Sequence, residues 1–372
     1  MAIVSQNSNS RLDFLDALRG LAAAYVVVYH MVLIPSPHLL VPNWAVKIAE
    51  SGGTGVMLFF VVSAFSLYYT MPIREKESYP KLSFYLHRFF RIAPLFYLWV
   101  ALSIIRDAWY FSAYHPIRMI IEAVALIFNL LPGGQQSFVW ASWTIGIEVL
   151  YYVAFPLIYK NVNNIWRAMT LLFGFIMLWM FFLTVLQYIP IGENTRASIE
   201  QWIFIRFLPV FAIGGISYFV FIKTSTLENS ELSKSIGLFL IVLSMASYMF
   251  LLNGHFNFIF SDPRVWQGLI YGALLIGLSL NPIKLLVNKF TRYLGKISYS
   301  LYLGHTTCVL LLTPIYFYIY RLFGNVSESF LASYILTLAC AIPVATMTYY
   351  LVEKPGIRLG KRIYAWCVAE LN

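Results

Sequence analysis

The chain has 372 residues, of which 60% are hydrophobic and 11% are charged, and its formal net charge is +10 at pH 7. A soluble domain usually has about 25% charged residues, so this composition excludes an ordinary soluble domain and predicts an all-α integral membrane protein. Anchoring at a membrane face with anionic lipid explains the positive charge. Membrane lipid is therefore an expected partner, and nucleic acid is not.

Charge-poor stretches recur along the whole chain, and most are long enough to cross about 30 Å of hydrocarbon as a helix. A further apolar piece at 117–131 contains Glu122, and we expect it to be a re-entrant or short helix on the outer side. No connection exceeds about twenty residues, so we expect a single membrane domain over residues 1–372 without a fused soluble domain. We predict ten transmembrane helices, at residues 14–34, 53–72, 90–111, 142–159, 168–189, 202–222, 235–253, 265–282, 297–320 and 330–352.

Basic residues gather on one side of this arrangement. With ten spans, the loops on the side of the two termini, counted with the flanking span ends, carry 19 of the 26 lysines and arginines. Because positively charged loops are retained in the cytoplasm, we predict that the N- and C-termini are both cytoplasmic. The three cysteines predict no disulfide framework, since two of them fall inside spans.

The first span holds three ionisable residues. A charge inside a span costs about 2.5 to 3.5 kcal/mol on insertion scales, so each such residue needs a partner or a function. Arg19 can pair with Asp16 one turn earlier. His30 lies about 16 Å further along the helix, toward the outer face. There it either donates to a neighbouring backbone carbonyl or takes part in chemistry, and the sequence leaves both possibilities open.

Two arginines stand at the inner mouth of the third span. Arg88 and Arg91 lie three residues apart in "HRFFRIAPLFY", so both guanidinium groups project from one helical face. Guanidinium groups bind phosphate oxygens bidentately. The pair is therefore a candidate phosphate site, and anchoring to lipid headgroups is the alternative.

The fourth span carries Glu148 within "WASWTIGIEVLYY". Counted from the outer face, Glu148 falls at about the depth of His30. A carboxylate beside an imidazole satisfies both groups and orients the imidazole proton, so we expect the two residues to pair. A structural ion pair, or a protonated glutamate hydrogen-bonded in the core, is the alternative.

Together these residues define a direction across the membrane, from arginines at the inner face to His30 and Glu148 near the outer face. The arrangement suits an enzyme that takes an activated group from a phosphate-bearing cytoplasmic donor and delivers it further out. The alternative is a proton-coupled secondary transporter or flippase with His30 and Glu148 as its relay. Transporters usually contain two related halves, and this chain shows no internal repeat. Further residues that could line the route, although such residues are often core, are Asp16, Trp143, Tyr299 and His305.

Six pieces of the sequence follow one another between residues 11 and 355: "LDALRGLAAAYVVVYH" with Arg-x10-His spacing, "GGTGVMLFFVVSAFSL", "HRFFRIAPLFY", "SWTIGIEVLYY", "LGKISYSLYLGH" and "YYLVEKP". In their residues and their order they resemble the motifs of the membrane-bound acyltransferase family 3, whose members include O-acetyltransferases of bacterial surface polysaccharides. The pattern of that family leads us to expect a glycine where this chain has Ala64, which adds one methyl group to the second span.

The resemblance implies an O-acyltransferase of the bacterial inner membrane. Such an enzyme moves an acetyl group from cytoplasmic acetyl-CoA to a hydroxyl of an extracytoplasmic or lipid-linked glycan. The resemblance also implies that His30 acts in the transfer, as general base or as acyl acceptor, and that Glu148 supports it. Acetyl-CoA would be placed by Arg19, Arg88 and Arg91, and no metal is implied. Some relatives carry an extracytoplasmic hydrolase-like domain, which we do not expect here.

Overall fold

The computed structural model describes residues 12–225, 230–255 and 262–371, and within these ranges it contains helices and loops but no β-strand. Eight stretches are long and apolar enough to cross a membrane, as expected of an integral membrane protein. Each predicted span corresponds to one helix: α1 (Asp13–Leu33), α3 (Gly55–Arg74), α4 (Pro80–Tyr110), α6 (Trp143–Asn161), α7 (Ile165–Leu186), α9 (Leu208–Thr224), α10 (Glu231–Leu252), α11 (Pro263–Leu280), α13 (Ser298–Phe323) and α14 (Val326–Thr348).

The number of spans and their orientation stay predictions. Helices α6 and α11 are not among the eight stretches that meet the length and hydropathy of a membrane span. The segment at 117–131 forms helix α5 (Ile117–Val124) and the turn η2 (Phe128–Leu130). With eight residues, α5 is about 12 Å long and too short to cross the hydrocarbon, in agreement with the short helix predicted there.

Other short elements link the long helices, and polar caps mark where several helices begin. Asparagine, aspartate and serine side chains accept hydrogen bonds from backbone amides of the first helical turn, which otherwise have no intrahelical partner. These caps are Asn164, Ser230, Asp262, Asn288 and Asn325. The short elements are α2 (Val46–Glu50), η1 (Gly52–Thr54), α8 (Glu193–Trp202), η3 (Phe204–Phe207) and α12 (Lys289–Lys296).

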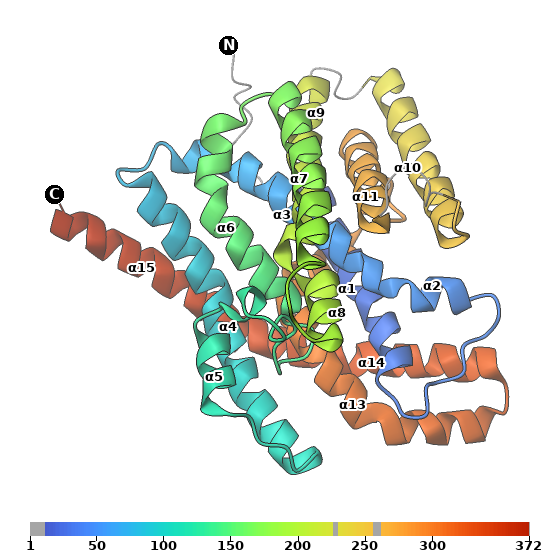
Figure 1. The fold of residues 1–372 in the computed structure, drawn as a ribbon. Helices are drawn as coiled ribbons and strands as arrows, with labels where there is room; N and C mark the ends of the chain where they lie inside the picture. Colours follow the sequence, from blue (N-terminus) through green and yellow to red (C-terminus); the bar gives the residue numbers. More distant parts are fainter. Residues whose placement is uncertain (1–11, 226–229, 256–261, 372) are drawn as a thin grey trace.

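Helix α1 lies at the centre of the fold, in contact with α3, α12 and α13. Helix α3 packs in turn against α9 and α11, and α10 lies at one edge of the molecule in Figure 1. Helices α7 and α10 expose large apolar side chains, such as Met177 and Phe239. An exposed apolar surface of this extent is what a lipid-facing helix presents. Helix α1, by contrast, is surrounded by other helices and can carry the polar side chains of a functional site.

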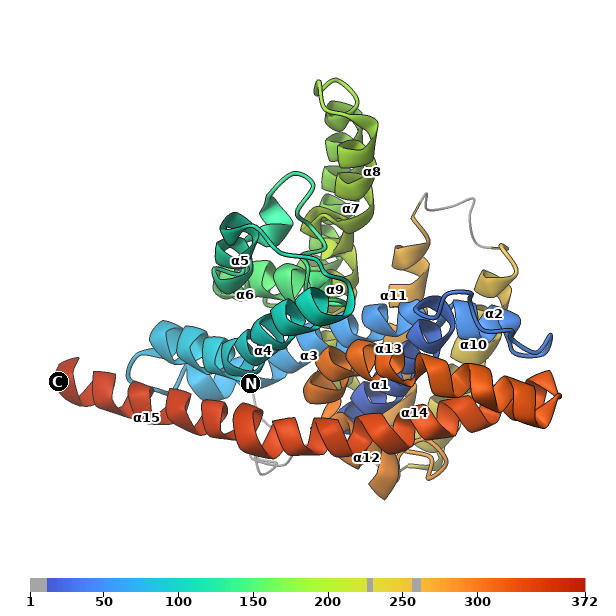
Figure 2. The same cartoon turned by 90° about the horizontal axis from the view of Figure 1, so that it is seen from below.

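Helices α14 and α15 (Lys354–Leu371) form a long helical rod that follows the lower edge of the molecule in Figure 2. Helix α14 continues through the π-helix η5 (Tyr349–Glu353) into α15, and Figure 2 shows α14 and α15 nearly in line. Helix α15 packs closely on α4 because Gly356 faces Pro94 and Gly360 faces Phe90. An added Cβ would lie 2.7 Å from Pro94 Cγ at Gly356 and 2.6 Å from Phe90 Cβ at Gly360. This contact brings Lys361 to the same space as the arginines of α4.

Ala64 is accommodated by the helix that faces it. On α9, Gly214 lies against α3, and a Cβ added there would sit 2.7 Å from the Cβ of Ala64 and 2.4 Å from the carbonyl oxygen of Val61. Because α9 has no side chain at this point, the alanine methyl group fills space that the glycine leaves open. The departure from the family pattern is therefore compatible with close packing of α3 and α9.

Helices α1 and α12 approach each other closely at Gly295, and we predict that Gly295→Ala is strongly destabilising. A Cβ at Gly295 would lie 1.8 Å from the carbonyl oxygen of Asp16, so the helices must separate. Overpacking typically costs about 1 to 3 kcal/mol, and a backbone clash lies at the upper end. Thermal unfolding in detergent should show a clear drop in Tm. Gly174→Ala on α7 is the control, since nothing lies within 4 Å of its added Cβ; equal Tm values for the two variants would contradict the prediction.

Candidate active site

Two adjoining cavities occupy the centre of the bundle. One, of about 330 Å³, contains Arg19, Arg88 and Arg91 and is called the arginine cavity. The other, of about 690 Å³, contains His30 and is called the histidine cavity. Val56 and Tyr302 line both, so the two cavities meet at these side chains. Because Arg19 lies near the first turns of α1 and His30 near its last turn, the cavities open toward opposite ends of that helix.

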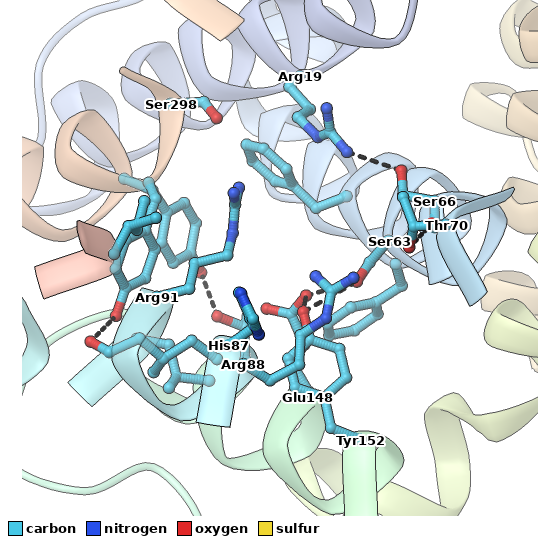
Figure 3. Close-up of a pocket in the computed structure, with 18 of the residues that line it drawn as sticks. Arg19, Ser63, Ser66, Thr70, His87, Arg88, Arg91, Glu148, Tyr152 and Ser298 are labelled. Carbon is cyan, nitrogen blue, oxygen red and sulfur yellow. Dashed lines mark hydrogen bonds between the residues drawn. The ribbon is translucent and has the colours of Figure 1, made fainter. Parts of the chain in front are cut away.

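The arginine cavity brings together the three arginines that the sequence suggested. Figure 3 shows Arg19, Arg88 and Arg91 converging on one space from α1 and α4. Arg19 is held at both sides, since its Nη2 donates to Ser66 Oγ at 2.7 Å and its Nη1 to Asp16 Oδ1 at 3.3 Å. The Arg88 guanidinium lies 5.2 Å from the centre of the Tyr152 ring, a cation–π contact. These contacts set the directions of the guanidinium groups.

Three further basic residues, which the sequence did not indicate as site residues, line the arginine cavity. Arg74 ends α3, the imidazole of His87 precedes Arg88 on α4, and Lys361 comes from α15. Arg74 Nη1 donates to Ser83 Oγ at 3.0 Å. In the sequence, Arg74 and Lys361 belong only to the basic residues counted on the inner side, and no local motif identifies either as a site residue. Their meeting depends on the packing of α15 against α4, which sequence spacing does not reveal.

Two guanidinium nitrogens in this cavity have hydrogen-bonding capacity to spare. The Nε atoms of Arg74 and Arg88 are buried, and neither has a hydrogen-bond partner among the described residues. A buried donor without a partner is costly unless a ligand satisfies it. Arginine donors in a cluster of positive charge fit the oxygens of phosphate groups. The cavity is therefore suited to a ligand with several phosphates.

Glu148 lies in the arginine cavity and not beside His30, which corrects the pairing expected from the sequence. Its carboxylate accepts hydrogen bonds from Ser63 Oγ and Tyr152 Oη, as Figure 3 shows. The reason for the difference is that several residues of the segment 128–142, which precedes α6, are buried, so α6 starts inside the protein. The same number of residues counted from the outer ends of α1 and α6 therefore does not give the same depth. Glu148 provides a negative charge among the arginines.

The histidine cavity combines aromatic faces and neutral polar groups with two ionisable side chains, Glu50 and Arg264. His30 Nδ1 lies 3.1 Å from the carbonyl oxygen of Val26 and 3.0 Å from Nε2 of His305. Trp143, predicted as a lining residue, does line this cavity and packs at 4.7 Å between ring centroids against Trp202. The other lining groups include Tyr29, Gln136, Ser137, Trp140, Gln201 and Gln267. Such a surface offers flat apolar faces and amide hydrogen bonds to a polar ligand.

The remaining predicted lining residues have different positions. Tyr299 lines the arginine cavity and donates to the carbonyl oxygen of Ile92 at 2.9 Å. Asp16 lines neither of the two cavities and forms an ion pair with Arg19. His305 lines neither and is fully buried behind His30. Across residues 12–225, 230–255 and 262–371, no group of three histidine, cysteine, aspartate or glutamate residues is arranged to hold a metal.

Comparison with known proteins agrees with the resemblance carried by the motifs. A protein of the Acidianus two-tailed virus, named as an acetyltransferase, is 26% identical over 296 residues, which cover 77% of this chain and 80% of the relative. The peptidoglycan O-acetyltransferase OatA of Listeria monocytogenes is 23% identical over 403 residues, which cover 95% of this chain and 57% of the relative. No solved structure matches the chain. The family model described as an acyltransferase domain matches residues 12–350, and the chain therefore belongs to the acyltransferase 3 family of membrane acyltransferases.

Proposed function

We propose that this acyltransferase binds acetyl-CoA in the arginine cavity and transfers the acetyl group to a hydroxyl of a glycan in the histidine cavity. The observation that carries the proposal is the meeting of two cavities of different character at Val56 and Tyr302. One is lined by four arginines, and the other contains an imidazole among mainly aromatic and amide side chains, with one arginine, Arg264. A donor with phosphates and an acceptor without them would each find a matching surface.

The arginine cavity supports a coenzyme A thioester as the donor. The guanidinium groups of Arg74, Arg88 and Arg91, which line the cavity, supply donors for phosphate oxygens. With the phosphates held there, the thioester end of the donor extends past Val56 and Tyr302 toward His30. Helices on all sides exclude water that would hydrolyse the thioester.

In the transfer, His30 acts as the general base. The acceptor hydroxyl gives its proton to His30 Nε2 while its oxygen bonds to the thioester carbonyl carbon. The carbon–sulfur bond then breaks, and the departing thiolate takes the same proton, which leaves an ester and free coenzyme A. A route through an acetylated His30 would use the same ring nitrogen as nucleophile.

The glycan acceptor is proposed from the lining of the histidine cavity and from the printed name of OatA, a peptidoglycan O-acetyltransferase. Aromatic rings such as Trp140 and Trp202 offer faces for the apolar side of a sugar ring, and Gln136 and Gln201 offer hydrogen bonds to hydroxyls. A lipid-linked or extracytoplasmic glycan would reach this cavity from the end of α1 that carries His30. A bacterial inner membrane is the proposed location.

The alternative of a proton-coupled transporter is less well supported. It needs His30 and Glu148 in one relay, whereas within the described chain the hydrogen bonds of His30 go to Val26 and His305 and those of Glu148 to Ser63 and Tyr152. A relay would have to cross from one cavity to the other past Val56 and Tyr302.

The proposed function predicts sided transfer. Acetyl-CoA carries several charges and does not cross a bilayer, so radiolabelled acetyl-CoA added outside should label glycans in inside-out membrane vesicles and not in right-side-out vesicles. The label should be released by mild base, as an O-ester is and an amide is not. Membranes without the protein provide the background. Absence of base-labile label in inside-out vesicles would contradict the function, and label confined to right-side-out vesicles would contradict the orientation.

A further inference from the structure

The buried residue His305 on α13 is in direct contact with His30. Its side chain is fully buried, with 0% exposure, and its ring centre lies 4.8 Å from that of His30. His305 Nδ1 lies 2.6 Å from the carbonyl oxygen of Tyr302, and its Nε2 lies 3.0 Å from His30 Nδ1. Both ring nitrogens are therefore engaged, and the two imidazoles form one chain of hydrogen bonds from the backbone of α13 to the histidine cavity.

The direction of each hydrogen bond in this chain follows from the partners. A carbonyl oxygen only accepts, so His305 Nδ1 carries the proton and donates to Tyr302. In a neutral imidazole the other nitrogen then accepts, so His305 Nε2 accepts a proton from His30 Nδ1. The carbonyl of Val26, 3.1 Å from the same His30 nitrogen, also requires a donor there. Two independent acceptors thus place the proton of His30 on Nδ1.

We propose that His305 is a positioning residue for acyl transfer, which fixes His30 in the tautomer whose unprotonated Nε2 serves the histidine cavity. This proposal rests on the proposed function and deepens it. His305 lines neither cavity, so it acts through His30 and does not touch substrate. It fills the place that the sequence analysis assigned to Glu148.

The hydrogen-bonded pair also accommodates the charge that the reaction creates. When His30 Nε2 takes the acceptor proton, its ring becomes positive and its Nδ1 proton is held more strongly by His305 Nε2. The positive charge is then spread toward a second ring whose own proton is bound to the Tyr302 carbonyl. When the thiolate takes the proton from His30 Nε2, the pair returns to its neutral state. No proton is gained or lost over the cycle.

A neutral acceptor suits this position better than a carboxylate would. His305 is fully buried, and an ionised carboxylate at that site would itself need charge partners. Arg106 on α4, whose Nη1 donates to Thr307 two positions further along α13, is already paired with Asp107. An imidazole supplies the acceptor without adding a charge to the resting protein.

Two substitutions of similar size test the proposal. His305→Gln keeps an acceptor oxygen near the place of Nε2, whereas His305→Leu fills the space without one. With radiolabelled acetyl-CoA and isolated membranes as the glycan source, we expect kcat to fall about 10- to 100-fold in His305→Leu and to stay within about threefold of wild type in His305→Gln. The KM for acetyl-CoA should change little in both, because the arginine cavity is separate.

A matched control and a spectroscopic readout separate positioning from packing. Tyr316→Phe removes a buried hydrogen bond to Thr337 between α13 and α14, away from both cavities, and should leave kcat unchanged. Nitrogen NMR of protein labelled in its histidines should show His30 protonated at Nδ1 in the wild type. In His305→Leu only the 3.1 Å contact to the Val26 carbonyl still favours this tautomer, so a fraction protonated at Nε2 should become detectable. His30 signals are identified by their loss in His30→Ala.

The outcomes distinguish the two proposals. Equal losses of kcat in the Gln and Leu variants, full activity in His305→Leu, or an unchanged tautomer of His30 in that variant would each overturn the role of His305. A wild-type protein that transfers no acetyl group would overturn the proposed function instead, and the NMR experiment would still report on the histidine pair, because it requires no turnover.

Discussion

Replacing His30 with alanine should lower acetyl transfer by about 100- to 10,000-fold and leave binding of acetyl-CoA nearly unchanged. General acid–base catalysis by a positioned side chain contributes rate factors of this size. His30 lines the histidine cavity, whereas the arginines that would bind the donor line the other one, so the substitution removes the base without disturbing donor contacts. Initial rates of label transfer, together with equilibrium binding of coenzyme A, measure the two effects separately.

The control for this experiment is a histidine at the same end of α1. His38 is exposed and follows the helix in a loop, where its Nδ1 lies 3.1 Å from the carbonyl oxygen of Pro35. His38→Ala should transfer acetyl groups at the wild-type rate. Because the histidine cavity has a volume of about 690 Å³, added imidazole should also restore part of the activity of His30→Gly. Wild-type transfer by His30→Ala would refute the role of His30 as base.

Much of the fold follows from the sequence because a bilayer allows few solutions. Backbone groups in hydrocarbon must be satisfied within the helix, so long apolar stretches become helices, and each of the predicted spans coincides with one. The ten residues between Arg19 and His30 separate them along a single helix, so their location in different cavities could be predicted from helical rise alone. Arg88 and Arg91, one turn apart on α4, share a cavity for the same reason.

Contacts between distant helices could not be predicted in the same way. The partner of His30 is His305, 275 positions away in the sequence, and the depth of Glu148 depends on the buried segment that precedes α6. The sequence identifies both histidines and the glutamate as unusual in their settings, but it contains no measure of depth across helices. On chemical grounds alone a carboxylate is the expected partner of His30, but the packing of the helices places the imidazole of His305 there.

Replacing both arginines of α4 with glutamine should weaken binding of coenzyme A by about 100-fold or more. A hydrogen bond to a charged group contributes about 1.5 to 3 kcal/mol, and Arg88→Gln/Arg91→Gln removes at least two such bonds to phosphate while keeping polar side chains of moderate length. Glu148 and the remaining cations Arg19 and Arg74 stay in place, so the cavity keeps its shape. Calorimetric titration of the purified protein with coenzyme A gives the affinity directly.

A comparison of coenzyme A with pantetheine shows whether lost phosphate recognition causes the loss of affinity. Pantetheine lacks the phosphates of coenzyme A, so it should bind wild type and the double variant with the same weak affinity. Arg118→Gln is a suitable control, because Arg118 is paired with Glu122 on α5, outside both cavities. If the arginines only anchor lipid headgroups, coenzyme A would bind the double variant as well as wild type, and the arginine cavity would not be a donor site. A loss of affinity for coenzyme A but not for pantetheine would show that Arg88 and Arg91 bind the phosphates of the donor. Removal of a lipid anchor would affect the binding of the two ligands equally.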